Sequence, residues 1–300
     1  MLNIISKTKY AYIFSIALSV LSILSLAVWG LKYDIDFTGG TRMAVKFADE
    51  IPAKNEVAAT LESLNLNSLT LQNSENNTIV IRYASEDDNV NDEVWKAIVG
   101  KYGQATQSSV DFINSTVSGE LKSKSLSAIV LAIAVIMAYI AWAFRKVSRP
   151  VESWKYGAGA AIALAHDILI TTGVFSILGH FYGIEVGIPF IAALLTILGF
   201  SVHDTIVVYD RTRENLLRGS NKEDFADVVN KSLNETLVRS INTSMTVIIT
   251  LLAIYFFGGV AIKYFALALL VGIAFGTYSS IFIASALLVT SHELTIRYKR

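Results

Sequence analysis

Six runs of apolar residues, each long enough to cross a lipid bilayer, constrain the fold of this chain more than any other feature. A membrane-spanning helix needs about 20 predominantly apolar residues. The composition agrees, since 53% of the 300 residues are hydrophobic and only 17% are charged. In hydrocarbon every backbone polar group must be bonded within the protein, so we predict an α-helical membrane bundle and not a soluble enzyme. The predicted spans are 10–31, 125–144, 156–178, 186–208, 241–257 and 264–289.

The distribution of lysine and arginine predicts how these spans are oriented. Cytoplasmic loops carry an excess of basic residues, and here they gather after the second and fourth spans, whereas loop 179–185 has none. Both termini and segment 209–240 are therefore expected to be cytoplasmic, and residues 32–122 to lie outside. The first span, within residues 1–31, is expected to be an uncleaved anchor, because its apolar run is too long for a signal peptide. The basic residues in question are Arg145, Lys146, Arg149, Lys155, Arg211, Arg213, Arg218, Lys222, Lys231 and Arg239.

The polar stretch 32–122 has the pattern of one small α+β domain, and residues 123–300 supply the rest of the bundle. Alternating apolar residues predict strands, and apolar residues at three- and four-residue spacing predict helices. Their order, strand–helix–strand–strand–helix–strand, is that of a ferredoxin-like unit. The expected strands are 42–47, 68–72, 78–83 and 104–113, and the expected helices are 53–63 and 87–99.

Two aspartates lie inside predicted spans, Asp167 in the third and Asp204 in the fourth. A charge at the bilayer centre costs about 2.5–3.5 kcal/mol on insertion scales, so such a residue indicates a proton or ion relay that faces the bundle interior. Arg239 opens the fifth span at the cytoplasmic level of Asp204. We therefore expect these two side chains to meet, which would ease the burial of both charges. His166 precedes Asp167 as His203 precedes Asp204.

Each of these residues also has a structural interpretation. Asp204 can form a static pair with Arg239, Asp167 can be a neutral acid bonded to His166, and His203 can serve packing alone. Depth favours Asp167 as the relay, because it lies roughly 16 Å along its predicted span, near mid-bilayer. Asp204 lies closer to the predicted cytoplasmic end.

Small and hydroxyl-bearing residues mark the expected contacts between helices. Glycines and alanines at 157–161, and Gly272 with Gly276, have the small-xxx-small spacing that lets helix backbones approach closely. Three serines of the sixth span, Ser279, Ser280 and Ser285, can hydrogen-bond across helices.

The segment 223–239, between the fourth and fifth spans, is amphipathic and is expected to lie on the inner membrane surface. The sequence has no phosphate-binding loop, dinucleotide fingerprint or metal-ligand cluster, and its four histidines are scattered. No cofactor, bound metal or nucleic acid is therefore expected, and we do not expect an enzyme.

Several motifs resemble those of the SecD/SecF family of protein-export membrane proteins. The run Asp-Ile-Asp-Phe-Thr-Gly-Gly-Thr after the first span is similar to the signature that opens the exported domain of that family, and it contains Asp36, Gly39 and Gly40. The later motifs resemble the SecF branch and follow in the same order and topology. They cover residues 165–167, 199–215, 234–240, 257–259 and 276–284.

The resemblance implies a bacterial inner-membrane component of the protein export apparatus. It implies the fold of one six-helix half of a resistance-nodulation-division (RND) transporter, with a small ferredoxin-like periplasmic domain, working with SecD at the SecYEG channel. The pair would use proton flow to move the exported domains, which pull on the translocating polypeptide. Membrane lipids would surround the helices. By motif, Asp204 is the proton-responsive acid and Arg239 supports it, so the resemblance ranks Asp204 above Asp167.

Two other functions remain open at this point. A proton-driven exporter of small molecules or lipids from the same superfamily would need a second copy, because larger members carry twelve spans and two outer domains. A membrane scaffold would use Asp204 and Arg239 as a static clamp. The coupling ion is also open: a lone carboxylate beside an arginine suits H⁺, whereas Thr205 and Ser201 could help to bind Na⁺.

Overall fold

The computed structural model describes residues 2–48, 50–74, 76–85, 87–145, 151–218 and 223–298. These residues form two compact units. We call Tyr33–Leu126 together with Glu185–Ile188 the sheet unit, and the remaining described residues the helical unit. The sequence did not indicate that the short segment Glu185–Ile188 would group with the sheet.

The helical unit accounts for the predicted membrane bundle. Among the described residues, six helices are long and apolar enough to cross a membrane, which confirms the predicted fold class. The sixth span, Ile262–Arg297, is continuous although it changes geometry: α9 passes into a π-helical segment, η3, and then into α10. The helices are α1 (Thr8–Val28), α5 (Ser115–Ala143), α6 (Ser153–Tyr182), α7 (Ile188–Arg218), α8 (Phe225–Phe257), α9 (Val260–Ser279), η3 (Ser280–Ala284) and α10 (Ser285–Tyr298), preceded by the short turn η1 (Ile5–Lys7).

Small residues allow these helices to pack closely, as their spacing predicted. A Cβ added at Gly157 of α6 would lie 2.5 Å from the carbonyl oxygen of Met137 on α5. A Cβ added at Gly272 of α9 would overlap the side chain of Ile197 on α7. Because such approaches are closer than real Cβ contacts, glycine is required for these helix pairs to meet as they do.

The helix α8 corrects one expectation. Segment 223–239 does not form a separate surface helix, because α8 runs without interruption from Phe225 to Phe257. Its apolar residues Phe225, Val229 and Leu233 are buried in a core that also contains Tyr209 of α7. The amphipathic pattern therefore reflects packing against other helices. An apolar helix face can be buried against a protein core as well as against a membrane surface. Three of the basic residues used for the orientation, Lys146, Arg149 and Lys222, lie outside the described residues.

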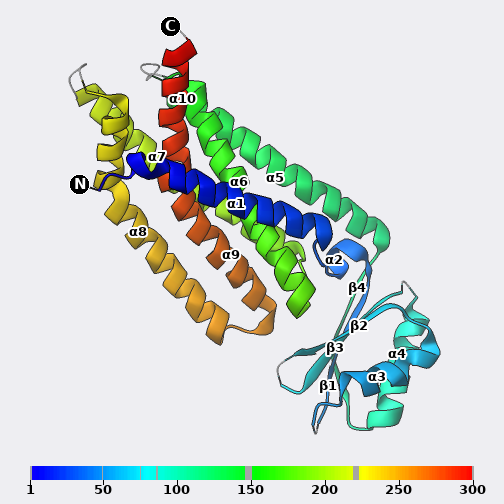
Figure 1. Cartoon of the computed structure of the whole chain (residues 1–300). Coiled ribbons are helices and arrows are strands. Elements are labelled where there is room, and N and C mark those ends of the chain that lie inside the picture. Colours follow the sequence, from blue (N-terminus) through cyan, green and yellow to red (C-terminus); the bar gives the residue numbers. More distant parts are fainter. Residues whose placement is uncertain are drawn as a thin grey trace. The chain divides into compact units, whose positions relative to one another are not determined.

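The sheet unit has the predicted ferredoxin-like order. Its sheet is four-stranded and entirely antiparallel, with the order β2-β3-β1-β4. Helices α3 and α4 cover one face of this sheet (Figure 1). The core between them contains Met43, Val45, Ile79 and Ile81 from the strands and Val57, Leu61, Val94 and Ile98 from the helices. The elements are α2 (Ile35–Thr38), β1 (Gly40–Lys46), α3 (Lys54–Leu61), η2 (Glu62–Leu64), β2 (Asn67–Ser74), β3 (Thr78–Ala84), α4 (Asp88–Tyr102) and β4 (Thr106–Ile113).

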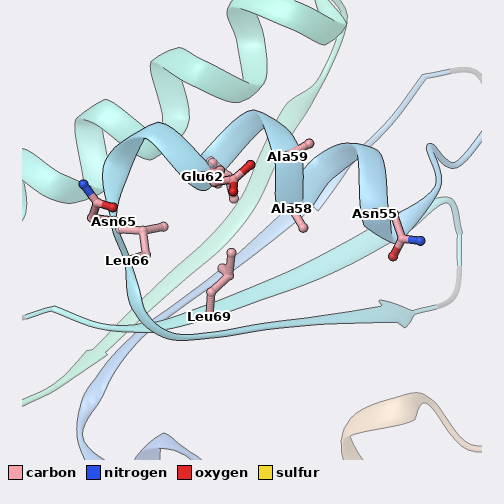
Figure 2. A pocket seen from close by; sticks show the side chains of 8 residues that line it. Asn55, Ala58, Ala59, Glu62, Asn65, Leu66 and Leu69 are labelled. Carbon is pink, nitrogen blue, oxygen red and sulfur yellow. The ribbon is translucent and has the colours of Figure 1, made fainter.

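A surface hollow beside α3 and the start of β2 is shown in Figure 2. Its lining includes Glu62 as the one ionisable side chain among Asn55, Ala58, Ala59, Leu61, Asn65, Leu66 and Leu69. This lining does not provide converging catalytic groups.

Candidate functional site: two carboxylates buried between helices

Asp167 is fully buried in the middle of α6, with 0% of its surface exposed. Its Oδ2 accepts a hydrogen bond from the Ser201 hydroxyl of α7 at 2.7 Å and another from the Ser279 hydroxyl of α9 at 2.7 Å. One carboxylate oxygen therefore joins three helices. Buried polar groups need such partners, because an unpaired one loses its hydration without compensation.

His166 faces the other oxygen of the same carboxylate. Its Nδ1 lies 3.0 Å from Asp167 Oδ1, and its Nε2 is buried without a hydrogen-bond partner among the described residues. A bond at this distance requires one proton between the two atoms, carried by either the imidazole or the acid. Sequence analysis placed His166 beside Asp167, and the structure shows that they touch.

Asp204 lies on α7 and is 2% exposed. Its environment differs from that of Asp167, since its Oδ2 lies 3.5 Å from the Ser244 hydroxyl of α8, a longer contact than either serine makes with Asp167. The Ser244 hydroxyl also lies 2.5 Å from the Thr277 hydroxyl of α9 and donates to the Ser240 carbonyl at 2.9 Å. Asp204 thus faces a pair of hydroxyls at the junction of α7, α8 and α9.

The expected contact between Asp204 and Arg239 is not formed. The Arg239 side chain is exposed on α8, and the ion pairs of the described residues do not include one between these two groups. Arg239 does lie within electrostatic range of Asp204, as does the exposed His203. The face of α8 that meets Asp204 carries Ser240 and Ser244, four residues apart, and Arg239 points off that face.

The two acid clusters share the helices α7 and α9. Ser201 and Asp204 are three residues apart on α7, and Thr277 and Ser279 are two residues apart on α9. Gly276 of α9 makes this proximity possible, because a Cβ there would lie 2.9 Å from the Cβ of Ser201. Gly276, which belongs to the small-residue spacing predicted from the sequence, therefore helps to place the Ser201 hydroxyl that donates to Asp167.

The π-helical segment η3 begins directly after Ser279. Tyr209 of α7, which is fully buried, donates a hydrogen bond to the Ala284 carbonyl in this segment at 3.1 Å. Single π-helical turns within α-helices occur frequently at functional sites. Of the three serines expected to bond across helices, only Ser279 is recorded as doing so, since Ser280 donates to Thr277 and Ser285 donates to Ser280 in their own span.

The signature residues Asp36, Gly39 and Gly40 belong to the sheet unit. Gly40 has φ +112°, and a Cβ there would lie 2.6 Å from the Tyr83 carbonyl oxygen. Both conditions require glycine at the start of β1. Asp36 Oδ2 accepts a hydrogen bond from the backbone N–H of Ile188, at 2.8 Å.

Among the residues that the structure describes, no group of three or more His, Cys, Asp or Glu side chains is arranged to hold a metal ion. The residues that sequence analysis missed are Ser244 and Thr277. Serine and threonine are common in transmembrane helices, so neither residue carries a signal that distinguishes it until its neighbours are known.

These features define a multi-pass membrane protein whose helices enclose buried acids, an arrangement typical of proton or ion pathways. The family model "Protein export membrane protein SecD/SecF, C-terminal" matches residues 94–294. The chain is 43% identical to the protein translocase subunit SecF of Thermobaculum terrenum, over 95% of this chain and 93% of that one. It is 39% identical to the SecF subunit of Anaerolinea thermophila, over 96% and 94%. The chain therefore belongs to the SecD/SecF family of protein export membrane proteins.

The crystal structure of SecDF, a translocon-associated membrane protein from Thermus thermophilus, has the same fold. It superposes with a TM-score of 0.84 at 31% sequence identity and covers 97% of this chain. The match covers only 39% of the SecDF chain, so the present chain spans about two fifths of that protein. A second SecDF structure, in a super-membrane-facing form, has a TM-score of 0.69 and 32% identity, with 99% of this chain and 40% of that one covered.

Proposed function

We propose that this chain is the SecF subunit of a bacterial Sec export machinery and that, with SecD, it uses the proton motive force to promote protein translocation. The observation that carries this proposal is the pair of buried carboxylates, Asp167 and Asp204, held between helices of a chain that belongs to a protein-export family. SecD, the SecYEG channel and the translocating polypeptide are the partners that we propose. The likeness to a translocon-associated SecDF chain supports them.

The proposed location is the inner membrane. The chain would have both termini in the cytoplasm and the polar stretch 32–122 on the periplasmic side. The basic residues after the second and fourth spans support this orientation. Under it, the sheet unit would meet the polypeptide as it emerges.

Proton binding at the two acids would change different helix contacts. A proton on Asp204 gives this acid a donor of its own, so it can bond to the Ser244 hydroxyl, which already contacts Thr277. The contact of α7 with α8 and α9 would then be rearranged. A proton on Asp167 needs no such rearrangement if it is shared with His166 on Oδ1. We therefore assign the responsive role to Asp204 and a supporting role to Arg239, which lies within electrostatic range of Asp204 and attracts it only while Asp204 is ionised.

The available energy fits this scheme. A proton that crosses 100 mV gains about 2.3 kcal/mol, and a free energy of that size shifts a two-state equilibrium by roughly fiftyfold. No covalent chemistry is required. Among the described residues, the hydroxyls beside Asp204 are those of Ser244 and Thr277. The Thr205 and Ser201 hydroxyls, which could help to bind Na⁺, donate elsewhere, to the Ser201 carbonyl and to Asp167. We therefore propose H⁺ as the coupling ion.

The test is translocation of a secreted protein into inverted membrane vesicles that contain this chain and SecD, with and without a proton gradient. Asp204→Asn is compared with Asp210→Asn, which neutralises an exposed aspartate on the same helix. We expect Asp204→Asn to lose the gradient-dependent increment and to keep gradient-independent translocation, and Asp210→Asn to keep both. Asp167→Asn reports whether the second acid also contributes.

Equal increments in wild type and Asp204→Asn, at equal amounts of assembled protein, would make Asp204 a structural charge. If instead translocation is unaffected and Asp204→Asn impairs resistance to small toxic compounds, the chain is an exporter of small molecules or lipids. A Na⁺ gradient that replaces the proton gradient in full would overturn the choice of H⁺.

A further inference from the structure

The segment Glu185–Ile188, which links α6 to α7, is built into the sheet unit. Tyr33 and Val186 form a parallel β-bridge, and the Asp34 N–H donates to the Val186 carbonyl at 3.0 Å. Val186 is 1% exposed. Residues 185–188, which comprise the second half of the linker between the two membrane helices and the first residue of α7, thus pair with the segment that precedes β1.

A buried ionic group holds the same segment through side chains. Arg82 of β3 forms an ion pair with Glu185, and its Nε lies 3.5 Å from Asp34 Oδ1. These side chains are 14%, 8% and 15% exposed, so the group is largely removed from water. Burial lowers the pKa of the Arg82 guanidinium, although the nearby Asp34 opposes this shift. Removing Arg82 would take away its ion pair with Glu185 and its contact with Asp34, and breaking a buried ion pair is destabilising.

The signature residue Asp36 fixes the other end of the segment. Its Oδ2 accepts the N–H of Ile188, which is the first residue of α7. Gly187 lets this happen, because a Cβ there would lie 2.5 Å from Asp36 Oδ2 and 3.5 Å from Asp34 Cβ. The Asp36 carboxylate and the Asp34 main chain therefore both bond to residues 185–188, and Gly187 leaves the space for the Asp36 contact.

We propose that Asp34, Asp36, Arg82 and Glu185 form a clasp that keeps residues 185–188 fixed to the sheet unit while α7 moves. Because Ile188 begins α7, the helix that carries Ser201 and Asp204, a closed clasp passes the motion of that helix directly to the outer domain. This inference rests on the proposed function, since it gives the step between proton binding and domain motion. It makes Arg82 and Asp36 positioning residues.

The decisive comparison is between two arginines of the same sheet. Arg82 contacts Glu185 in the linker, whereas Arg42 pairs with Asp111 on β4 at 2.9 Å and with Asp34 at 3.5 Å. Arg82→Met removes the ion pair of the clasp with Glu185 and keeps an aliphatic stem. Arg42→Met is the control: both variants lose a contact with Asp34, and only Arg82→Met loses the contact with the linker. We expect Arg82→Met to lower the gradient-dependent increment of translocation by about fivefold or more, the lower end of ordinary coupling between sites. Arg42→Met should keep most of it.

A reversible lock tests whether the clasp stays closed. The chain has no cysteine of its own. Neighbouring strands lie about 4.8 Å apart, which is within the Cα separation that a disulfide spans. The double variant Tyr33→Cys/Val186→Cys, oxidised, should therefore hold the bridge shut and keep the gradient-dependent increment. Its reduced form and the two single variants are the controls. Loss of the increment on oxidation and its return on reduction would overturn the proposal, because the clasp would then have to open.

Hydrogen exchange measures the clasp without transport. In wild type and Arg42→Met the amides of residues 185–188 should exchange slowly, and in Arg82→Met they should exchange faster. Equal exchange and equal translocation in the two arginine variants would refute the clasp. If wild type itself shows no gradient response while exchange differs as expected, the clasp stands and the proposed function fails.

Discussion

Replacing Gly276 by alanine tests the packing that brings Ser201 to Asp167. The added Cβ would lie 2.9 Å from the Ser201 Cβ, 3.2 Å from its Oγ and 3.5 Å from its Cα. Rotation of the Ser201 side chain moves only the Oγ, so it cannot relieve the contact with Cβ. The two helices α7 and α9 must separate by several tenths of an ångström, and we expect the Ser201–Asp167 bond of 2.7 Å to lengthen with them.

The size of the effect has two parts. Overpacking a well-filled helix contact costs about 1–3 kcal/mol. A hydrogen bond between transmembrane helices contributes about 0.6 kcal/mol on average and about 1.7 kcal/mol at most. Weakening one such bond while repacking one contact should therefore lower the free energy of unfolding by about 2 kcal/mol, in the lower part of the combined range because the bond is weakened and not lost. That corresponds to a change of roughly thirtyfold in the unfolding equilibrium constant.

The assay is unfolding of the purified chain by sodium dodecyl sulfate in mixed micelles, followed by the fluorescence of its four tryptophans. Gly199→Ala is the matched control, because it makes the same substitution on α7 where an added Cβ meets nothing within 4 Å. We expect this control to raise the free energy of unfolding by about 0.5–1 kcal/mol, the ordinary gain when alanine replaces a mid-helix glycine without a clash.

A swap of the two small residues sharpens the test. Ser201→Gly removes the Cβ that Gly276→Ala would strike, so the double variant should recover the overpacking cost but not the lost hydroxyl. The two changes should then be non-additive by about 1 kcal/mol or more. Additive effects, or equal losses in Gly276→Ala and Gly199→Ala, would show that the close approach of α7 and α9 does not determine stability.

Two further predictions concern tyrosine hydroxyls. Tyr209→Phe removes the hydrogen bond to the Ala284 carbonyl. It should lower the free energy of unfolding by about 0.6–1.7 kcal/mol in the same assay and speed hydrogen exchange in residues 280–289. Unchanged exchange would contradict a role of Tyr209 in holding the π-helical segment. Burial raises the pKa of Tyr83, whose hydroxyl donates to Asn91 Oδ1, to about 12. The stability that wild type has over Tyr83→Phe should therefore be constant below the unfolded pKa near 10 and fall as the pH rises through about 12. Thermal unfolding of both chains at several alkaline pH values measures this, and a constant difference would refute it.

The parts of the fold that the sequence predicted are those fixed by repeating patterns. Apolar length identified the spans, and alternation with helical spacing identified the ferredoxin-like unit, because both follow directly from backbone geometry. The spacing of Gly272 and Gly276 also predicted a real helix contact. Segment 223–239 was misassigned because an amphipathic face has the same pattern whether it meets lipid headgroups or a protein core.

The candidate site was only half visible in the sequence. A carboxylate in an apolar span carries a large free-energy cost of insertion and therefore indicates a function, so Asp167 and Asp204 could be identified from the sequence. The partners of Asp204 were not, since the hydroxyls of Ser244 and Thr277 fit lipid-facing and buried positions alike. The expected bond from Arg239 failed for a geometric reason: matching depth along two helices does not set the rotation of either helix, and Arg239 lies one position away from the face that Ser240 and Ser244 share.

The helix α7 connects the clasp with the buried acids, and its length sets what kind of motion it can carry. Its 31 residues span about 46 Å at 1.5 Å per residue. An axial shift reaches both ends of a continuous helix undiminished, because it leaves the backbone hydrogen bonds intact. A rotation would instead carry Asp204 away from Ser244 and Ser201 away from Asp167, breaking both contacts together. If proton binding at Asp204 shifts α7 along its axis, the pull arrives at Ile188, where the Asp36 carboxylate holds the first N–H of the helix. The acid and the signature residue would then be two ends of one mechanical element.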